Sequence, residues 1–187
     1  MIGYLPETLS VGGQEYGIAT DYRDIMVIME AYNDPELTKK EATIVALKFL
    51  YDDFNSIPEK DRQEAADKAI WFLDCGQVED NKKASKKLVD WDQDQAILFP
   101  AINKVAGREV RAADYMHWWT FMGLFMEIGG DGLFSQVLTI RQKMAKGRKL
   151  EKWEQEFYRN NKTLCDIKTR YTQEEQTEME HLKQIFK

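Results

Sequence analysis

The chain has 187 residues and a formal net charge of −6, from 26 Lys and Arg against 32 Asp and Glu. With 43% apolar residues and only 4 Pro, the composition excludes globally disordered, Pro-rich and collagen-like classes. The 2 Cys are too few for a disulfide framework, and no apolar stretch is long enough to span a bilayer. No signal-peptide pattern opens the chain, so we expect a soluble protein of the cytoplasm.

The charge is unevenly distributed along the chain. Residues 141–170 carry ten basic and four acidic side chains, a net charge of +6, so the remaining residues carry −12. Any function has to account for this polarity.

The first predicted element is a β-hairpin near the N-terminus. Apolar residues alternate over residues 9–11 and 16–18, and Gly12-Gly13 between them tolerates the positive φ of a tight turn. An isolated hairpin is only marginally stable in water, so we expect this one to pack on helices.

Helical periodicity begins at Tyr22 and continues through most of the chain. A capping box at Thr38 and Glu41 precedes the second predicted helix, and we expect Asp114 to cap a later one. The last predicted helix opens with a capping box at Thr172 and Glu175 and carries Met179, Leu182 and Phe186 on one stripe. Pro100 is expected to kink or split its helix, because proline lacks an N–H donor and clashes with the preceding turn. The predicted helices cover residues 22–29, 44–54, 66–73, 97–105, 115–128, 134–144, 150–157 and 172–186.

These elements predict a mostly α fold, a multi-helix bundle with a short N-terminal β-hairpin. A division into two helical lobes is the open alternative. The polar residues 79–90 predict a linker or a long surface loop. It would join an N-terminal hairpin and helical lobe, residues 1–78, to a C-terminal helical lobe, residues 91–187.

The residue types that carry metal and catalytic chemistry are not gathered into a known pattern. His117 and His181 lack the spacing of metal ligands, and we expect His117 to be packed. Asp90, Asp92 and Asp94 imitate the start of a calcium loop, but the required Gly and final Glu are missing. We expect these acids to cap the following helix instead. The sequence therefore predicts no enzyme, no metal site and no cofactor.

The predicted helix over 115–128 is apolar on nearly all sides. Such a helix is either central to a core or half buried in a partner. Aromatic residues and Met are common in interface cores, and Met adapts to varied partners. We expect a core helix, with a second role in an oligomer or client surface as the alternative. Its candidate contact residues are Trp118, Trp119, Met122, Phe125 and Met126.

The basic segment, residues 141–170, is the second candidate surface. Leu150, Trp153 and Phe157 share a helical stripe, so we expect their side chains to be buried. The cations are expected to form a solvated face, or to match an acidic surface on another copy or a partner. Phosphate contacts to a nucleic acid are the alternative. We expect Arg141, Tyr158 and Arg159 to face outward. The candidate contact residues of this segment are Arg141, Lys146, Arg148, Tyr158 and Arg159.

Several short strings of residues, taken together in their order along the chain, resemble those of a known protein family. They include Val11-Gly12-Gly13, Thr20-Asp21-Tyr22-Arg23, Asp90-Trp91-Asp92-Gln93-Asp94, Tyr115-Met116-His117-Trp118-Trp119-Thr120-Phe121, and residues 140–150 and 153–158. Together they resemble the bacteriophage "gp-fifteen" family, tail-module proteins from phages and prophages of Gram-positive bacteria. The resemblance covers most of the chain and is weakest over residues 33–88 and 162–187.

The resemblance implies a role in assembly and no catalytic residues. Such proteins are encoded between the major tail protein and the tape-measure protein, a position associated with tail assembly chaperones. Those chaperones coat the tape-measure helix until the tail tube forms around it. The implied partners are tape-measure or other tail proteins and further copies of the chain, without a membrane, in the cytoplasm of the infected or lysogenic host. A nucleic-acid-binding phage regulator and a structural tail or head–tail completion protein stay open as alternatives.

Overall fold

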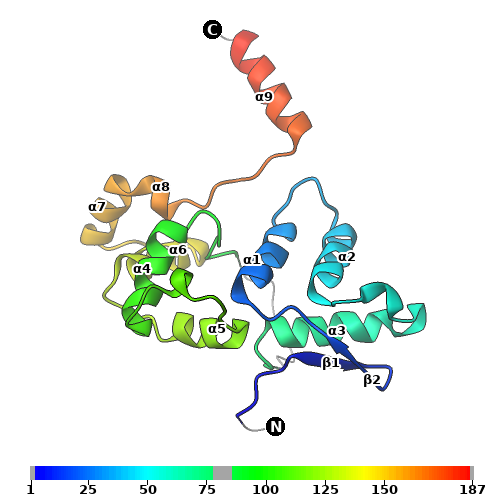
Figure 1. Ribbon diagram of the computed structural model, residues 1–187. Helices are drawn as coiled ribbons and strands as arrows, with labels where there is room; N and C mark the ends of the chain where they lie inside the picture. Colours follow the sequence, from blue (N-terminus) through cyan, green and yellow to red (C-terminus); the bar gives the residue numbers. More distant parts are fainter. Residues whose placement is uncertain (1–2, 78–85, 186–187) are drawn as a thin grey trace. The chain divides into compact units, whose positions relative to one another are not determined.

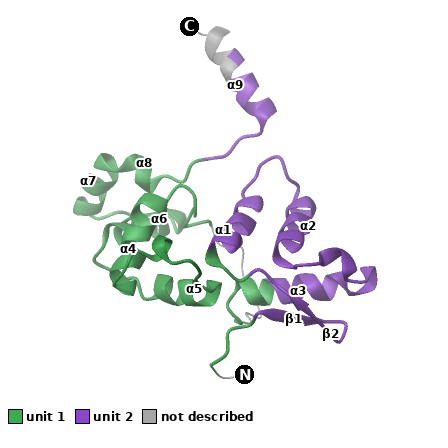
Figure 2. Ribbon diagram, viewed as in Figure 1, with its two compact units in different colours: residues 1–6, 20–22, 70–168 green, residues 7–19, 23–69, 169–187 purple. Residues whose placement is uncertain are grey.

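The computed structural model describes residues 3–77 and 86–185, and its fold is mostly α with an N-terminal two-stranded hairpin, as the sequence predicts (Figure 1). The chain divides into two compact units, coloured separately in Figure 2. Unit 1 comprises Met1–Pro6, Thr20–Tyr22 and Ile70–Lys168, and unit 2 comprises Glu7–Ala19, Arg23–Ala69 and Thr169–Lys187. The predicted linker, residues 79–90, lies partly outside the described residues and stays a prediction.

The hairpin belongs to unit 2. Its strands, β1 (Thr8–Val11) and β2 (Gln14–Gly17), pair antiparallel. Gly12 and Gly13 at the turn have φ of +58° and +80°, a conformation that glycine adopts without a steric penalty. One face of the hairpin, which includes Leu9, is buried in the core of unit 2.

The remaining elements of unit 2 are helical. The predicted capping box is present, because the Glu41 N–H donates to Thr38 Oγ1 and the Thr38 N–H donates to Glu41 Oε2. Tyr51 follows the capped helix into the core, where its hydroxyl donates to the Ala65 carbonyl over 2.8 Å. The helices that lie wholly or mainly in unit 2 are α1 (Tyr22–Ala31), α2 (Lys39–Leu50), the 3-10 turns η1 (Phe54–Ser56) and η2 (Glu59–Asp61), α3 (Arg62–Leu73) and α9 (Gln173–Ile185).

Unit 1 is built from short helices around an aromatic core. Tyr22 stacks on Phe121 with 4.5 Å between ring centroids, and Trp118 lies against the same ring. Its helices are α4 (Gln95–Ala106), η3 (Val110–Ala112), α5 (Trp118–Met126), α6 (Leu133–Ala145), α7 (Lys152–Asn160) and α8 (Lys162–Cys165). Helix α4 runs continuously through Pro100, so the predicted split does not occur.

The start of α5 differs from the prediction. Asp114 does not cap it, because the chain stays extended as far as His117 and pairs with residues 20–22. The Trp118 N–H donates to the Thr20 carbonyl over 2.7 Å, and the Tyr22 N–H to the Met116 carbonyl over 3.0 Å. His117 is the N-cap, and its Nδ1 accepts the Trp119 N–H. The expectation that His117 is packed is confirmed, since its side chain is buried.

Helix α9 begins at the predicted capping box. The Glu175 N–H donates to Thr172 Oγ1, and the Thr172 N–H donates to Glu175 Oε2. Of the predicted apolar stripe of this helix, Met179 is half-buried, and the side chains of residues 182 and 186 lie outside the described ones. None of the described helices combines the length and the apolar run needed to cross a membrane.

Candidate protein-interaction surfaces

The two tryptophans of α5 hold the end of α3. The Trp118 Nε1–H donates to the Leu73 carbonyl over 3.0 Å, and the Trp119 Nε1–H donates to the Phe72 carbonyl over 2.8 Å. Trp118 is fully buried and Trp119 is half-buried against other aromatic rings. Both indoles therefore stabilise unit 1, and Trp118 is not available to a partner.

The C-terminal half of α5 is more accessible than its beginning. Phe125 packs on Trp91 and Phe134, with ring centroids 5.3 and 5.9 Å away, and keeps part of its ring in solvent. Met122 is half-buried and Met126 is exposed. Of the five candidate contact residues on this helix, only Met126 is mostly accessible.

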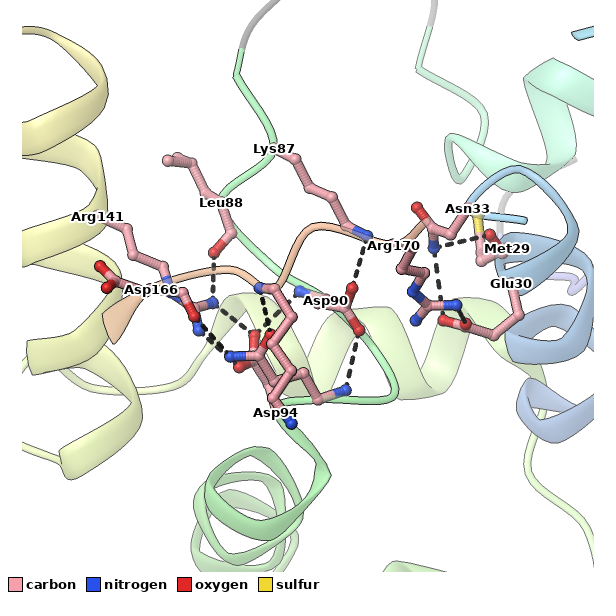
Figure 3. A network of polar contacts seen from close by, with 12 residues as sticks. Met29, Glu30, Asn33, Lys87, Leu88, Asp90, Asp94, Arg141, Asp166 and Arg170 are labelled. Carbon is pink, nitrogen blue, oxygen red and sulfur yellow. Dashed lines mark hydrogen bonds and ion pairs between the residues drawn. The ribbon is translucent and has the colours of Figure 1, made fainter. Parts of the chain in front are cut away.

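Arg141 is not an outward-facing residue, which corrects the prediction. Its side chain is 5% exposed and its guanidinium is bonded on all sides (Figure 3). Nη1 and Nη2 donate to the two carboxylate oxygens of Asp94 over 2.6 and 2.8 Å. The remaining N–H groups donate to the carbonyls of Leu88, Leu164 and Cys165. A buried guanidinium needs this many acceptors, because every unpaired N–H inside a protein is costly.

The predicted capping role of Asp94 is confirmed for its position but not for its side chain. Asp94 occupies the N-cap position of α4, but its side chain makes no cap hydrogen bond, because both oxygens face Arg141. Asp94 Oδ2 also accepts the Asp90 N–H over 3.0 Å. Nearby, Gln93 Nε2 donates to the Asp166 carbonyl and its Oε1 accepts the Lys168 N–H. Together these bonds join the chain before α4 to the chain around α8.

A second ion pair, between a half-buried lysine and a buried glutamate, connects α6 to α7. Lys143 Nζ lies 2.6 Å from Glu154 Oε1, and the Glu151 N–H donates to Glu154 Oε2 over 2.8 Å. The hydrogen bond from Lys143 and the one from the Glu151 backbone lower the pKa of Glu154, and Glu154 in turn raises the pKa of Lys143. Because the buried side of α7 carries Glu154, Trp153 turns outward and is 51% exposed, so the predicted burial of Trp153 is wrong.

A run of exposed cations lies where α6 turns into α7. The helix α6 ends in a compact turn, because the Gly147 N–H donates to the Met144 carbonyl and the Arg148 N–H to the Lys143 carbonyl. Gly147 has φ of +64°, which suits glycine at this position. We call this surface the basic corner, and its exposed members are Met144, Lys146, Arg148, Lys149, Lys152 and Trp153.

The two other candidates of the basic segment lie on α7. Arg159 is exposed. Tyr158 is half-buried, and its hydroxyl donates to Asp166 Oδ1 over 2.9 Å, which raises the pKa of Tyr158. Tyr158 therefore has a structural partner in unit 1, whereas Lys146, Arg148 and Arg159 present their charges to solvent.

Unit 2 has an apolar groove between α1 and α2 that the sequence did not predict. Val27 and Phe49 are 53% and 58% exposed there. Arg170 lies at the edge, where its Nη1 donates to Glu30 Oε2 over 2.6 Å (Figure 3). We call this surface the α1–α2 groove, and its apolar lining is Val27, Ala31, Pro35, Leu37, Val45 and Phe49.

The thiols and potential metal ligands do not form a reactive site among the described residues. Burial raises the pKa of Cys75 to about 11, and it also raises the pKa of Cys165. The described residues contain no group of three or more His, Cys, Asp or Glu side chains that could hold a metal ion.

The protein is thus mostly α and consists of two compact units. The Arg141–Asp94 ion pair is buried, whereas the α1–α2 groove and the basic corner are exposed. The family model described as Bacteriophage Gp15 protein matches residues 1–167, so the chain belongs to that family and is a phage protein. This is the gp-fifteen family that the residue strings resemble. Neither the comparison with curated proteins nor the comparison with solved structures found a match.

Proposed function

We propose that this phage protein acts in tail assembly, as a chaperone that binds the tape-measure protein while the tail is built. The observation that carries the proposal is the family match, which spans residues 1–167. The role itself comes from the family resemblance, which associates such proteins with the tape-measure gene. The proposed place of action is the cytoplasm of the infected or lysogenic host. The protein has no catalytic role and no cofactor in this proposal.

The α1–α2 groove supports the proposal as a site for the client. A chaperone for a long apolar helix needs an accessible apolar surface, and helices bind to such grooves through residues at i, i+3, i+4 and i+7. More than half of Val27 and more than half of Phe49 are exposed to solvent. Contiguous apolar surface of this kind marks interaction sites on proteins that are otherwise covered by polar groups.

The test is co-purification of the full chain with a tape-measure fragment after co-expression. We expect the unaltered chain to retain the fragment, and Val27→Ser with Phe49→Ser to reduce retention about tenfold or more, because each change removes apolar contact area. Ile70→Ser is the matched control, because Ile70 is 55% exposed and does not line the groove. Failure of the unaltered chain to retain any tape-measure fragment would contradict the proposed function.

A nucleic-acid-binding regulator is the second candidate, and the exposed Trp153 beside the cations favours it. Aromatic rings stack on bases, and Lys and Arg contact phosphates. DNA affinity that falls steeply with salt, and that is lost in Trp153→Ala, would support this candidate. Detection of the chain in purified virions by mass spectrometry would instead indicate a structural tail or head–tail completion protein.

A further inference from the structure

The basic corner is a pre-formed surface with accessible charge. The turn after α6 is held by two backbone hydrogen bonds, and Lys143 is bonded to Glu154, so the corner does not need to be ordered on binding. Lys146, Arg148 and Lys149 nevertheless remain exposed. Met144 and Trp153, which flank these cations in the sequence, are also exposed and add apolar area. A surface of this composition fits a partner that is acidic and carries some apolar side chains.

Helix α9 has the opposite character. The described side chains of residues 173–178 are all exposed, and three of them are Glu. Glu174 and Glu178 are one turn apart on the same face, where they line an open hollow with Gln173, Thr177 and His181. Glu175 is different, because its carboxylate caps the helix through Thr172. The whole of α9 follows residue 167, where the family match ends.

We propose that α9 of one copy binds the basic corner of a second copy. Glu174 and Glu178 face Lys146, Arg148 and Lys149, and the half-buried Met179 adds apolar contact beside Trp153. Every copy carries one helix α9 and one basic corner, so the contact is head-to-tail and leaves a free α9 and a free corner at the two ends. Such contacts produce open chains rather than closed dimers. This inference does not rest on the proposed function.

The expected strength follows from the exposure of the charges. Exposed ion pairs are each worth little and are screened by salt, so the contact is weak between two copies and fails at high ionic strength. Wherever many copies are held close together, the effective concentration rises and strengthens the same contact. The association is therefore sensitive to charge reversal on either side.

The experiment uses two full-length charge-reversed variants. The first carries Glu174→Lys and Glu178→Lys, and the second carries Arg148→Glu and Lys149→Glu. Sedimentation velocity over a series of protein concentrations should show self-association of the unaltered chain at low salt. Each variant alone should associate about tenfold more weakly, because like charges then face each other. A mixture of the two variants should associate again, because each α9 then meets a corner of opposite charge.

A control variant distinguishes loss of this contact from the effects of a changed net charge, and a folding measurement distinguishes it from unfolding. Glu59→Lys with Glu127→Lys changes the net charge by the same amount as the first variant, at two exposed acids outside α9, and should leave association unchanged. Circular dichroism verifies that all variants are folded. The proposal is overturned if the unaltered chain stays monomeric, or if the reversed variants associate as it does. It is equally overturned if the mixture stays monomeric, the result expected when α9 binds only its own corner.

Discussion

Arg141 and Asp94 form a buried ion pair on which much of unit 1 depends. Their side chains are 5% and 2% exposed, and the guanidinium also donates to three backbone carbonyls. Asp94→Asn keeps the shape of the side chain but leaves the guanidinium without its counter-charge. Loss of one partner of a buried pair costs about 3–5 kcal/mol. We expect the free energy of unfolding, measured by urea denaturation, to fall by that amount.

Asp92→Asn is the matched control for this substitution. Asp92 lies two residues away and is exposed, and its carboxylate accepts a hydrogen bond from the Gln95 side chain. Loss of an exposed charge changes stability by about 0.5 kcal/mol or less. Equal effects of the two substitutions would show that the Arg141–Asp94 pair does not stabilise the fold.

Glu154 gives unit 1 a stability that depends on pH. Hydrogen bonds from Lys143 and from the Glu151 backbone lower the pKa of Glu154 below its unfolded value of about 4.3. The carboxylate therefore stabilises the fold fully above that value, and the contribution is lost as the pH falls through the folded pKa. We expect Glu154→Gln to be less stable than the unaltered chain at about pH 7, and this difference in stability to be smaller at about pH 3. Urea denaturation at both pH values measures the difference.

The corresponding control is Glu156→Gln on the exposed side of the same helix. It removes one carboxylate from α7 without touching Lys143, so its effect on stability should be small at both pH values.

The contribution of Lys143 to stability depends on pH in the opposite direction from that of Glu154. The pKa of Lys143 is raised, so its contribution is complete below the unfolded pKa of Lys and is lost as the pH rises through the folded one.

The sequence predicted correctly that several cations are exposed, but it did not predict which side chains are buried by a partner elsewhere in the chain. Lys146, Arg148 and Arg159 are exposed, as the charge pattern suggested. Arg141 is buried because Asp94, 47 positions earlier, lies opposite it. Helical spacing likewise assigned Trp153 to the core, because no local signal shows that Glu154 takes the buried side to meet Lys143. A pair between side chains of two different segments leaves no trace in the periodicity of either segment.

At the scale of elements, glycine governs how two helices end. The α3 helix is followed by Gly76 with φ of +77°, and α4 by Gly107 with φ of +67°. A Cβ added at Gly76 would lie 3.1 Å from the Trp119 ring, whereas one at Gly107 would have nothing within 4 Å. Gly107→Ala therefore carries only the cost of a left-handed non-glycine residue, about 1–2 kcal/mol.

Gly76→Ala carries the same backbone cost and crowds a tryptophan ring in addition. We expect it to lower the free energy of unfolding by about 1–3 kcal/mol more than Gly107→Ala does. Urea denaturation of the two variants measures the difference directly. If the two substitutions destabilise the chain equally, the end of α3 is not packed against Trp119 in solution.

Element boundaries were predictable where the signal is local and were wrong where it is not. The capping boxes at Thr38 and Thr172 lie within four residues of the helices they start, and both are present. The start of α5 was placed too early, because residues before Trp118 are held extended by hydrogen bonds to residues 20–22. Those bonds join segments almost a hundred positions apart, so local propensity could not reveal them.

Part of the charge asymmetry of the chain is neutralised by bonds within the protein. Arg141 and Lys143 belong to the basic segment but are used in bonds within unit 1. Arg170, the last cation of the segment, is bonded to Glu30 in unit 2. What remains for a partner is the basic corner together with Arg159 and the cations around α8. The surface that the basic segment offers to a partner is therefore smaller than its sequence suggests, because several of its cations are bonded within the protein.

Removal of α9 tests whether this helix serves assembly rather than folding. A chain that ends at Lys168 keeps the bond from the Lys168 N–H to Gln93. It loses the part-exposed Arg170–Glu30 ion pair and the exposed hydrogen bond from the Gln173 N–H to Glu36 Oε1. A part-exposed pair is worth about 1 kcal/mol or less, so we expect stability to fall by roughly that amount. Self-association in sedimentation velocity should disappear, because no acidic helix is left to meet the basic corner. Full-length Arg170→Ala is the control, because it removes the ion pair, keeps α9, and should still associate. Undiminished association of the shortened chain would show that copies meet through another surface.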